Sequence, residues 1–427
     1  MNSVNVFKEW KSSGPRIENV VLFVSDALRW DYLPHDVAGR GVAFKTVASS
    51  LFTASSFPSI VSGLYPYHHG VYTFFHTIPR NLVTLLNLPG YNCTFWTVDL
   101  PGSSAIHRVL RSTNPIPLDK LEPPFIYLED EKGGHCPYGW TEEDENYAAD
   151  DCIKFFRDYG RKSNKELLES YKAGIERSVR EFNKRMEVLA ERNLLDHTLV
   201  VFLSDHGELL GEYGGIIAHE NLTTPEVVYV PTVFIHPDLP KGHSYEAQGV
   251  LRHVDLLPTI LDLLNIKLAP QTDGVNLCSI DLLPQTGNTY WEKRIRKRPL
   301  RIPVSVNIIE KSVWDQNGGY LFREGVNLLQ RLLSTLYSTT LSNGIQPLYW
   351  RGKLWKKPIH TAWTYPSMLK NYSSSRLKYG RPVFTFKEAK MLIDEVGEDI
   401  VKPVETDRVK SRIKDLKTNR KVTLRKR

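Results

Sequence analysis

The chain has 427 residues, of which 41% are hydrophobic and 24% are charged, so it can bury the core of one large α/β domain with additions, or of two domains. Residues 1–14 hold no apolar signal core and no apolar run is long enough to cross a bilayer, so we expect a cytoplasmic protein without a transmembrane anchor. The four cysteines form no C-x-x-C pair, which agrees with a reducing compartment.

The net charge of +7 is concentrated at the C-terminus. Residues 401–427 contain 11 Lys or Arg and 3 Asp or Glu, a net charge of +8, so the other 400 residues together carry −1. Such a segment is either a solvated helix or disordered. It offers a contact for an anionic partner, nucleic acid or lipid, although it lacks the interleaved aromatic residues of single-strand binders. A solvated terminus without a partner explains the basic composition of residues 401–427 equally well.

In chain order, the first predicted element is a buried strand over residues 19–26 (NVVLFVSD), an apolar run that stops at Ser-Asp. Residues 49–63 (SSLFTASSFPSIVSG) run from a hydroxyl-rich segment into a short helix. Residues 81–88 favour an amphipathic helix, and residues 91–99 favour the next strand. Residues 125–128 are another apolar run, and the loop after it contains two glycines and His135.

The most regular helical spacing covers residues 164–194. It leads into a second apolar run, residues 200–207 (VVFLSDHG), which predicts a central strand that stops at Asp205-His206. A glycine-rich loop that contains His219 follows, and then a strand and a helix that starts near Asp255. Because strands and helices alternate, we expect an α/β fold with a mostly parallel sheet covered on both faces.

From about residue 285 the pattern loosens. It allows a hairpin through Asn317-Gly318 and helices over residues 326–340 and 387–402, and nothing in it carries recognisable chemistry. We therefore divide the chain into three parts. These are a catalytic domain over residues 17–284, a smaller C-terminal region over residues 285–400, and the basic tail over residues 401–427.

Two strands that both end in acidic residues suggest a metal site. Asp26 follows the first strand, and Asp205 and His206 follow the central one, at the sheet edge where open α/β sheets place their ligands. One such pair would more often be a capping arrangement. The hydroxyl-rich helix start at Thr53 favours chemistry instead, because a metal can turn a poor hydroxyl nucleophile into an alkoxide. The N–H groups of a helix start also favour an anionic substrate.

From about Asn19 to Leu283 the sequence resembles the sulfatase-like branch of the alkaline phosphatase superfamily. The resemblance rests on motifs in family order and spacing: VVLFVSDALRWD, TASSFPSIVSGLYPYHHGV, DHTLVVFLSDHGELLGE, AHEN followed by VPTVFI, and VDLLPTILDLLNI ahead of DGVNL. It implies an alkaline-phosphatase-like three-layer sandwich, with helices on both faces of a mostly parallel central sheet and a smaller C-terminal region.

The family resemblance places the nucleophile at Thr53, ten residues before Gly63. Sulfatases have a cysteine or serine there, oxidised to formylglycine within C/S-x-P-S-R. This chain reads TASSF, and oxidation of a threonine would give a ketone rather than an aldehyde. It is similar instead to members with an unmodified threonine, such as the nucleotide pyrophosphatase/phosphodiesterases.

The same resemblance implies the metal ligands. Calcium-type sulfatases have an Asp pair after the first strand and Asp-Asn after the central one, whereas this chain has Asp26-Ala27 and Asp205-His206. Replacing a carboxylate by an imidazole favours Mn²⁺, Zn²⁺ or Fe²⁺ over Ca²⁺. We expect a first divalent cation on Asp26, Thr53, Asp205 and His206.

A second cation is an open alternative. Two-metal relatives use an Asp-x-x-x-His pair and a later histidine, and Glu131, His135 and His219 stand at comparable positions. In one-metal relatives a histidine of this loop acts on substrate oxygens instead. His135 and His219 therefore either bind metal or act as catalytic acid and oxyanion donors.

Together these features predict a metal-dependent hydrolase of a small-molecule or glycan phosphate or sulfate ester that forms a covalent threonine intermediate. The missing formylglycine motif favours a phosphoester. The alternatives are a true sulfuric ester hydrolase, a phosphoryl-group transferase and an inactive anion-binding scaffold. The sequence indicates neither the substrate nor the oligomeric state.

We assign structural roles to further residues near the motifs: a salt bridge for Arg29 and Asp31, a turn for His68 and His69, a helix start for His253 and Asp255, and a buried thiol for Cys136.

Overall fold

The structure is a computed structural model of the whole chain. It describes residues 6–97, 105–112, 115–140, 155, 164–215, 217–219, 222–268, 270–297, 304–325, 327–328, 348–350, 353–355 and 374–395.

The core of the molecule is an eight-stranded sheet with the order β10-β2-β8-β5-β1-β4-β3, in which β9 also pairs with β2. β8 runs antiparallel to both of its neighbours, and the other pairs are parallel. The strands are β1 (Asn19–Ser25), β2 (Val42–Val47), β3 (Asn92–Thr97), β4 (Phe125–Glu131), β5 (Thr198–Leu203), β8 (Tyr229–Ile235), β9 (His243–Ser244) and β10 (Leu251–Arg252).

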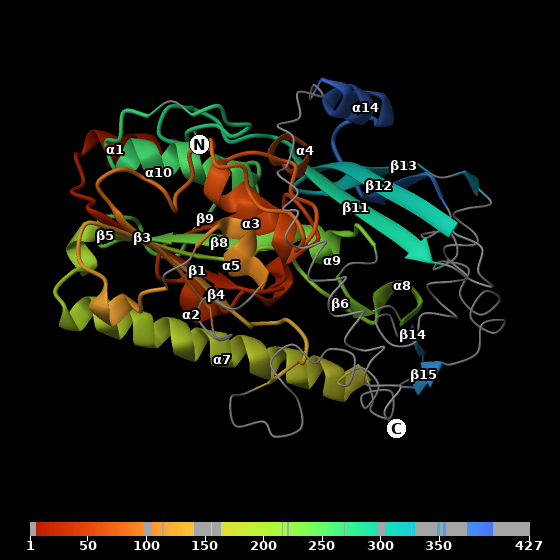
Figure 1. Cartoon of the computed structure of the whole chain (residues 1–427), viewed down its shortest axis with the longest axis horizontal. Coiled ribbons are helices and arrows are strands. Elements are labelled where there is room, and N and C mark those ends of the chain that lie inside the picture. Colours follow the sequence, from red (N-terminus) through yellow and green to blue (C-terminus); the bar gives the residue numbers. More distant parts are fainter. Residues whose placement is uncertain are drawn as a thin grey trace, which may run out of the picture.

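Helices cover both faces of this sheet, as Figure 1 shows. Alternate side chains of β1 point to opposite faces, so Val20 and Leu22 join one hydrophobic cluster and Val21 and Phe23 join the other. The first cluster is closed by α1 (Val6–Ser12), α3 (Thr53–Ser62), α5 (Ala105–Leu110) and α10 (Leu256–Leu263), and the second by α2 (His35–Ala38) and α7 (Asn164–Glu191). This confirms the predicted three-layer α/β architecture.

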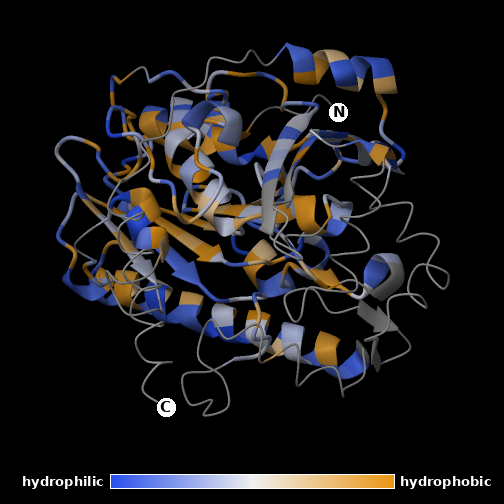
Figure 2. Cartoon of the chain, turned by 45° about the vertical axis from the view of Figure 1, so that its right-hand side comes forward, coloured by the Kyte–Doolittle hydropathy of each residue, from blue (hydrophilic) through white to orange (hydrophobic). Residues whose placement is uncertain are grey.

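The long helix α7 confirms the most regular sequence pattern. Its buried residues Leu167, Tyr171 and Ile175 are four residues apart, which places them on one face against the sheet. Figure 2 shows hydrophobic and hydrophilic residues alternating along it. The helix ends at Glu191, three residues before the predicted end, and Asn193 follows in the left-handed region with φ 55°.

The predicted helix over residues 81–88 is wrong, because this segment forms turns. The side chain of Asn87 accepts a hydrogen bond from the Thr84 N–H (2.8 Å) and donates one to the Leu82 carbonyl (2.9 Å). The Thr84 hydroxyl also accepts from the Leu86 N–H. These side chains offer the backbone an alternative to helical hydrogen bonds.

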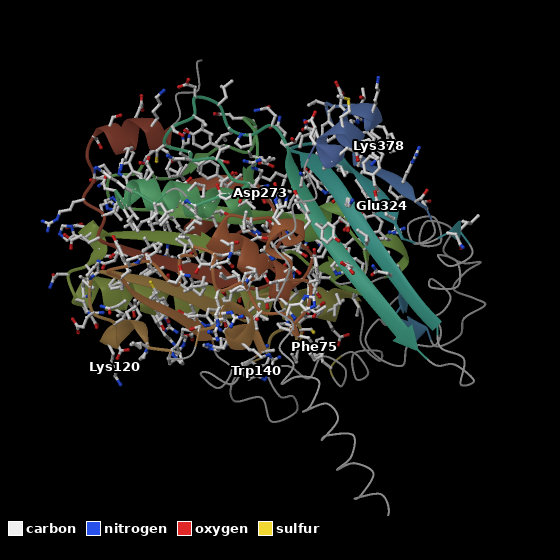
Figure 3. All side chains as sticks on the ribbon, turned by 45° about the horizontal axis from the view of Figure 1, so that its top comes forward. Phe75, Lys120, Trp140, Asp273, Glu324 and Lys378 are labelled. Atoms are coloured by element: carbon white, nitrogen blue, oxygen red, sulfur yellow. The ribbon has the colours of Figure 1, made fainter. Side chains whose placement is uncertain are left out.

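A second sheet lies beside the first and contains β11 (Gly287–Lys297), β12 (Val304–Asp315), β13 (Gly318–Glu324) and β16 (Arg376–Gly380), all antiparallel. The predicted hairpin is confirmed, with a two-residue loop at 316–317. In Figure 3, Glu324 and Lys378 mark this sheet, far from Lys120. Helix α14 (Phe386–Asp394) packs on it. The predicted helix over 326–340, except residues 327–328, and the tail over 401–427 lie outside the described residues.

The two sheets are joined near the end of β2. The Thr289 hydroxyl donates to the Ala48 carbonyl (2.7 Å), and the Tyr290 N–H donates to the Ser49 carbonyl (2.9 Å). Within the described ranges, no helix combines the length and the apolar character needed to cross a membrane. The remaining short elements are η1 (Trp30–Tyr32), α4 (Pro66–His69), η2 (Leu118–Lys120), η3 (Leu195–His197), β6 (Leu209–Leu210), α8 (Glu212–Gly215), β7 (Ile217–Ala218), α9 (Pro225–Val228), η4 (His253–Asp255), β14 (Leu348–Trp350) and β15 (Lys353–Trp355).

Candidate active site

Asp26 is the first residue after β1, and backbone hydrogen bonds on both sides hold it. Its N–H donates to the Glu131 carbonyl at the end of β4, and its own carbonyl accepts from the Gly134 N–H, both at 2.8 Å. Gly134 has no room for a side chain, because a Cβ there would meet the Ala27 carbonyl oxygen at 2.9 Å and the ring of Tyr171. The loop after β4 therefore fixes the direction in which the Asp26 carboxylate leaves the sheet.

Asp205 and His206 follow β5, which pairs with β1, so they reach the same edge of the sheet as Asp26. One Asp205 oxygen, Oδ1, accepts from the N–H groups of His206 (2.9 Å) and Ala27 (3.3 Å). The Ser204 hydroxyl accepts from the Leu28 N–H and donates to the His206 carbonyl, both at 2.8 Å. These bonds tie the two strand ends to each other.

Thr53 is the first residue of α3, and only 7% of its surface is exposed. Its hydroxyl oxygen Oγ1 lies 3.2 Å from Nε2 of His206. The nearby Ser56 hydroxyl donates instead to the Ser50 carbonyl (3.1 Å), and the Ser59 hydroxyl lies 3.1 Å from His69 Nε2. Thr53 is thus the helix-start hydroxyl that points at the strand-end residues.

Asp26, Asp205 and His206 form a group whose ligand atoms could bind one cation. His206 Nε2 lies 3.4 Å from Asp205 Oδ2 and 3.7 Å from Asp26 Oδ1. Both carboxylate oxygens are buried, and none of the described residues donates a hydrogen bond to them. Two buried acceptors without a donor, facing a ring nitrogen and a hydroxyl, fit a divalent cation. The structure therefore brings together all four residues of the predicted first metal site.

The electrostatics of the group agree with this assignment. Burial lowers the pKa of His206 to about 4, so the ring is neutral at physiological pH. His206 Nδ1 donates to the Gly207 carbonyl (3.0 Å), which leaves Nε2 as the lone-pair nitrogen toward the two aspartates. Burial, and then the charge of Asp205, raise the pKa of Asp26 well above its usual value. A bound cation would relieve that repulsion.

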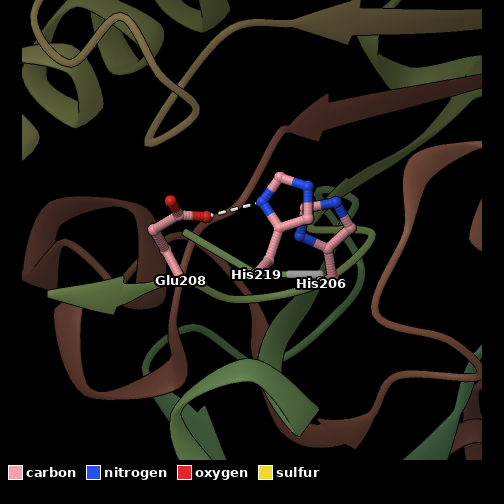
Figure 4. A group of neighbouring side chains, drawn as sticks. All are labelled: His206, Glu208 and His219. Atoms are coloured by element: carbon pink, nitrogen blue, oxygen red, sulfur yellow. Dashed lines mark hydrogen bonds and ion pairs between the residues drawn. The ribbon is translucent and has the colours of Figure 1, made fainter. Parts of the chain in front are cut away.

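His219, beside β7, joins the same site. Its ring centroid lies 4.0 Å from that of His206 and 5.2 Å from that of His135. His219 Nδ1 lies 2.7 Å from Oε2 of Glu208, as Figure 4 shows. Glu208 is completely buried and also accepts a hydrogen bond from the Tyr138 hydroxyl. The sequence reasoning missed Glu208, although an acidic residue two positions after His206, directly past a buried strand, was a usable signal.

Glu131 does not join the two histidines of the second metal site expected from the sequence. Its carboxylate forms an ion pair with Arg177 of α7 (2.9 Å) and accepts from the Gly133 N–H (2.8 Å). Among the described side chains, the second cluster with metal-ligand spacing is His206, Glu208 and His219 instead. Glu131, the last residue of β4, is directed toward α7 because its carboxylate pairs there with Arg177.

His135 is at the site but is directed by its own loop. Its Nδ1 donates to the Cys136 carbonyl (2.6 Å). Burial, and then the charge of Lys132, lower the pKa of His135 well below its usual value. Cys136 corrects our expectation of a buried thiol, because it is disulfide-bonded, whereas Cys93 and Cys278 are free. The cysteines therefore no longer argue for a reducing compartment.

The residues to which we assigned structural roles otherwise behave so. The Arg29 guanidinium pairs with Asp31 (2.7 Å) and with Glu212 (2.6 Å). His253 donates from Nε2 to the Ser204 carbonyl (2.9 Å), which holds the residue just after β5. His68 pairs with Asp273, the His69 Nδ1 accepts from the Val71 N–H, and the Asp255 carboxylate accepts from the Arg252 N–H.

Comparison with known proteins agrees with this geometry. A family model described as Sulfatase matches residues 125–266, from β4 to just past α10. A curated relative, the low-salt glycan biosynthesis sulfotransferase Agl7 of Haloferax volcanii, is 33% identical over 323 residues, which cover 73% of this chain and 76% of the relative. The chain belongs to the sulfatase family. It is therefore an enzyme of a family that acts on sulfate or phosphate esters and that generally depends on a metal.

More distant relatives share parts of the sulfatase-family chain. An arylsulfatase of Clostridium perfringens is 26% identical over 185 residues, which cover 41% of this chain and 37% of the relative. Two solved structures share the fold. A 2-O GAG sulfatase has a TM-score of 0.51 at 15% identity, over 96% of this chain and 94% of its own. A phosphonate monoester hydrolase of Agrobacterium radiobacter has a TM-score of 0.52 at 14% identity, over 83% of this chain and 91% of the hydrolase.

Proposed function

We propose that this protein is a metal-dependent hydrolase of phosphate or sulfate esters that uses Thr53 as its nucleophile. The observation that carries the proposal is the position of Thr53 Oγ1, 3.2 Å from His206 Nε2, beside two buried carboxylate oxygens, Asp26 Oδ1 and Asp205 Oδ2, that accept no hydrogen bond from the described residues. A hydroxyl in that position would be the fourth member of a cation site. Proteins rarely bury such a set of acceptors without a positive charge to satisfy them.

The first shell of the cation would be Asp26, Thr53, Asp205 and His206. One imidazole, two carboxylates and a hydroxyl favour Mn²⁺, Zn²⁺ or Fe²⁺ over Ca²⁺, which prefers a shell made only of oxygens. When bound, a divalent cation supplies the charge that makes the Thr53 hydroxyl acidic and the ester oxygens electron-poor.

In the first step, Thr53 Oγ1, having released its proton to water, attacks phosphorus or sulfur in line with the leaving oxygen. The bond from Oγ1 to phosphorus or sulfur forms as the bond to the leaving oxygen breaks. The protonated ring of His219 gives a proton to that oxygen and becomes neutral. The N–H groups at the start of α3, together with His135, face the charge on the remaining oxygens. The product is a phospho- or sulfothreonine and a free alcohol.

In the second step, water attacks the same phosphorus or sulfur atom, loses its proton to His219 and frees Thr53. We favour a phosphoester substrate because an ester of threonine has no geminal hydroxyl and cannot release its group by elimination, as formylglycine hydrate can. Release must occur by a second attack on phosphorus or sulfur.

A second candidate function is sulfuryl transfer to a glycan hydroxyl. The relative in Haloferax volcanii is named a glycan biosynthesis sulfotransferase and aligns with 73% of this chain. The same threonine ester would then pass its group to a carbohydrate hydroxyl instead of water. A small-molecule or glycan ester serves as donor in either case.

The test is an assay of purified protein, with Mn²⁺, Zn²⁺, Fe²⁺ or Ca²⁺, on 4-nitrophenyl phosphate, a bis-ester, a phosphonate monoester and 4-nitrophenyl sulfate. Thr53→Ala and an added oligosaccharide acceptor are the comparisons. Turnover of a phosphorus ester that disappears in Thr53→Ala supports the main proposal, and faster turnover of sulfate with acceptor supports transfer. Sulfate turnover that survives in Thr53→Ala refutes the nucleophile. If no ester is turned over and the purified protein binds no stoichiometric metal, an inactive scaffold is favoured.

A further inference from the structure

The buried carboxylate of Glu208 has no part in the cation site proposed above. It lies between two side chains from different loops, the hydroxyl of Tyr138 and the ring of His219. None of its surface is exposed, although glutamate is seldom buried completely. A buried acid of this kind, whose two oxygens both meet a donor, is a common way to hold a histidine in one orientation.

We infer that Glu208, supported by Tyr138, is a positioning residue that fixes the orientation and the Nδ1–H tautomer of His219. This rests on the proposed function, in which His219 exchanges a proton with the leaving oxygen. A carboxylate only accepts hydrogen bonds, so His219 Nδ1, 2.7 Å from Glu208 Oε2, must carry the hydrogen. Nε2, at the other side of the ring, is then the nitrogen that gives a proton when the ring is protonated and takes one up when the ring is neutral.

The support around Glu208 is rigid. Tyr138 donates its hydroxyl to Oε1, and its ring packs edge-on against Tyr171 of α7, with centroids 6.0 Å apart. The Arg29 guanidinium donates to the backbone carbonyl of Glu208 (3.4 Å). Gly207 before it has no space for a side chain, because a Cβ would overlap the Glu226 carbonyl oxygen. These contacts hold both the carboxylate and the backbone of Glu208 in place.

A second cation on His206, Glu208 and His219 is a weaker interpretation of the same cluster. Both oxygens of Glu208 already accept hydrogen bonds, and His206 Nδ1 already donates to the Gly207 carbonyl. A cation there would have to break these bonds. In Figure 4 the carboxylate is directed at the His219 ring edge, which suits a hydrogen bond.

The experiment compares two esters of the same acid that differ in leaving group, a 4-nitrophenyl ester and an alkyl ester. An alkoxide is a poor leaving group and needs a proton, whereas 4-nitrophenolate hardly does. We expect Glu208→Gln to lower kcat on the alkyl ester by about 10²–10³-fold and on the 4-nitrophenyl ester by less than about tenfold, with little change in KM. Tyr138→Phe should lower kcat on the alkyl ester by about tenfold and affect the 4-nitrophenyl ester less.

The matched control is the pair of Tyr213 and Glu226, a similar hydrogen bond (2.9 Å) in the same region that does not reach His219. Tyr213→Phe should leave both rates unchanged. His219→Asn should reproduce the pattern of Glu208→Gln, and the double variant should be no slower than His219→Asn alone. An equal loss on both esters, or additive losses in the double variant, would overturn the inference.

A second measurement does not depend on turnover. The ¹⁵N shifts of the His219 ring should show the Nδ1–H tautomer in the native protein and a mixture in Glu208→Gln. An Nε2–H tautomer in the native protein refutes the positioning role. Activity that survives in Thr53→Ala would refute the proposed function instead, so the two failures are distinct.

Discussion

The hydroxyl of Tyr171, in the N-terminal third of α7, donates to the carbonyl oxygen of Ala27 at 2.9 Å. The same hydroxyl accepts from the Arg29 N–H (3.1 Å). Ala27 has φ 58°, in the left-handed region that a residue with a side chain seldom adopts. A helical residue 144 positions further along the chain therefore holds the turn that aims Asp26 at the site.

Removing the Tyr171 hydroxyl should weaken this turn. We expect Tyr171→Phe to lower the free energy of unfolding by about 1–3 kcal/mol, because a buried carbonyl and a buried N–H lose their shared partner. Urea denaturation measures this. Tyr32→Phe is the control, since the Tyr32 ring packs edge-on against Tyr171 and its loss of a hydroxyl leaves both hydrogen bonds intact. Equal stability in Tyr171→Phe and the native protein would contradict the assignment.

A bound cation should stabilise the fold. At a Mn²⁺ concentration 100 times the dissociation constant, we expect the free energy of unfolding to rise by about 2.7 kcal/mol. Asp26→Asn should abolish most of that rise without destabilising the metal-free protein, because it removes one of two buried like charges.

Asp315→Asn is the control for the cation experiment. Asp315 is a buried carboxylate that accepts from the N–H groups of the β12–β13 turn, far from the site in the sequence. This variant should be less stable but keep the full response to Mn²⁺. A full Mn²⁺ response in Asp26→Asn would mean that the cation binds elsewhere.

The second sheet supports the His219 loop through a buried ion pair. Arg323 Nε lies 2.6 Å from Glu310, and Glu310 also accepts from the hydroxyl of Thr223, four residues after His219. Arg323→Met should cost about 3–5 kcal/mol, because it leaves a buried carboxylate without its partner. Thermal unfolding measures the loss. The double variant Glu310→Met/Arg323→Met should recover most of it, and no recovery would show that the loss came from packing.

Acid should destabilise the protein partly through His69. Burial lowers the pKa of His69 to about 3 in the folded chain, against an ordinary value of 6.5. The unfolded chain therefore binds more protons between these pH values. The contribution of neutral His69 to the free energy of unfolding is fully present above pH 6.5. It falls by up to about 1.4 kcal/mol per pH unit as the pH is lowered toward 3.

His69→Gln should reduce the pH dependence of unfolding by this amount while lowering stability at pH 7. Urea denaturation from pH 4 to pH 8 without metal measures both effects. A slope that matches the native protein would show that other groups account for the acid sensitivity.

The residues of the first cation site could be predicted because each one is next to a regular element. Asp26 and Asp205 end apolar runs, and Thr53 begins a helix, so their meeting at one sheet edge follows from the parallel pairing of β1 and β5. By contrast, the spacing of Glu131 and His135 placed Glu131 in a possible second cation site. Its partner Arg177 lies 46 residues away, and spacing cannot reveal such a contact.

The sequence by itself determined the layered α/β fold, the motif order and the four residues around the expected cation. These depend on local periodicity and on where buried strands end. Only the tertiary structure decided that Glu208, rather than Glu131, accompanies His219, and that residues 81–88 form turns. Those outcomes depend on which donor a buried acceptor meets across the packed core. Burying a charged group without a partner costs free energy, so its side chain is directed at the partner that the fold provides.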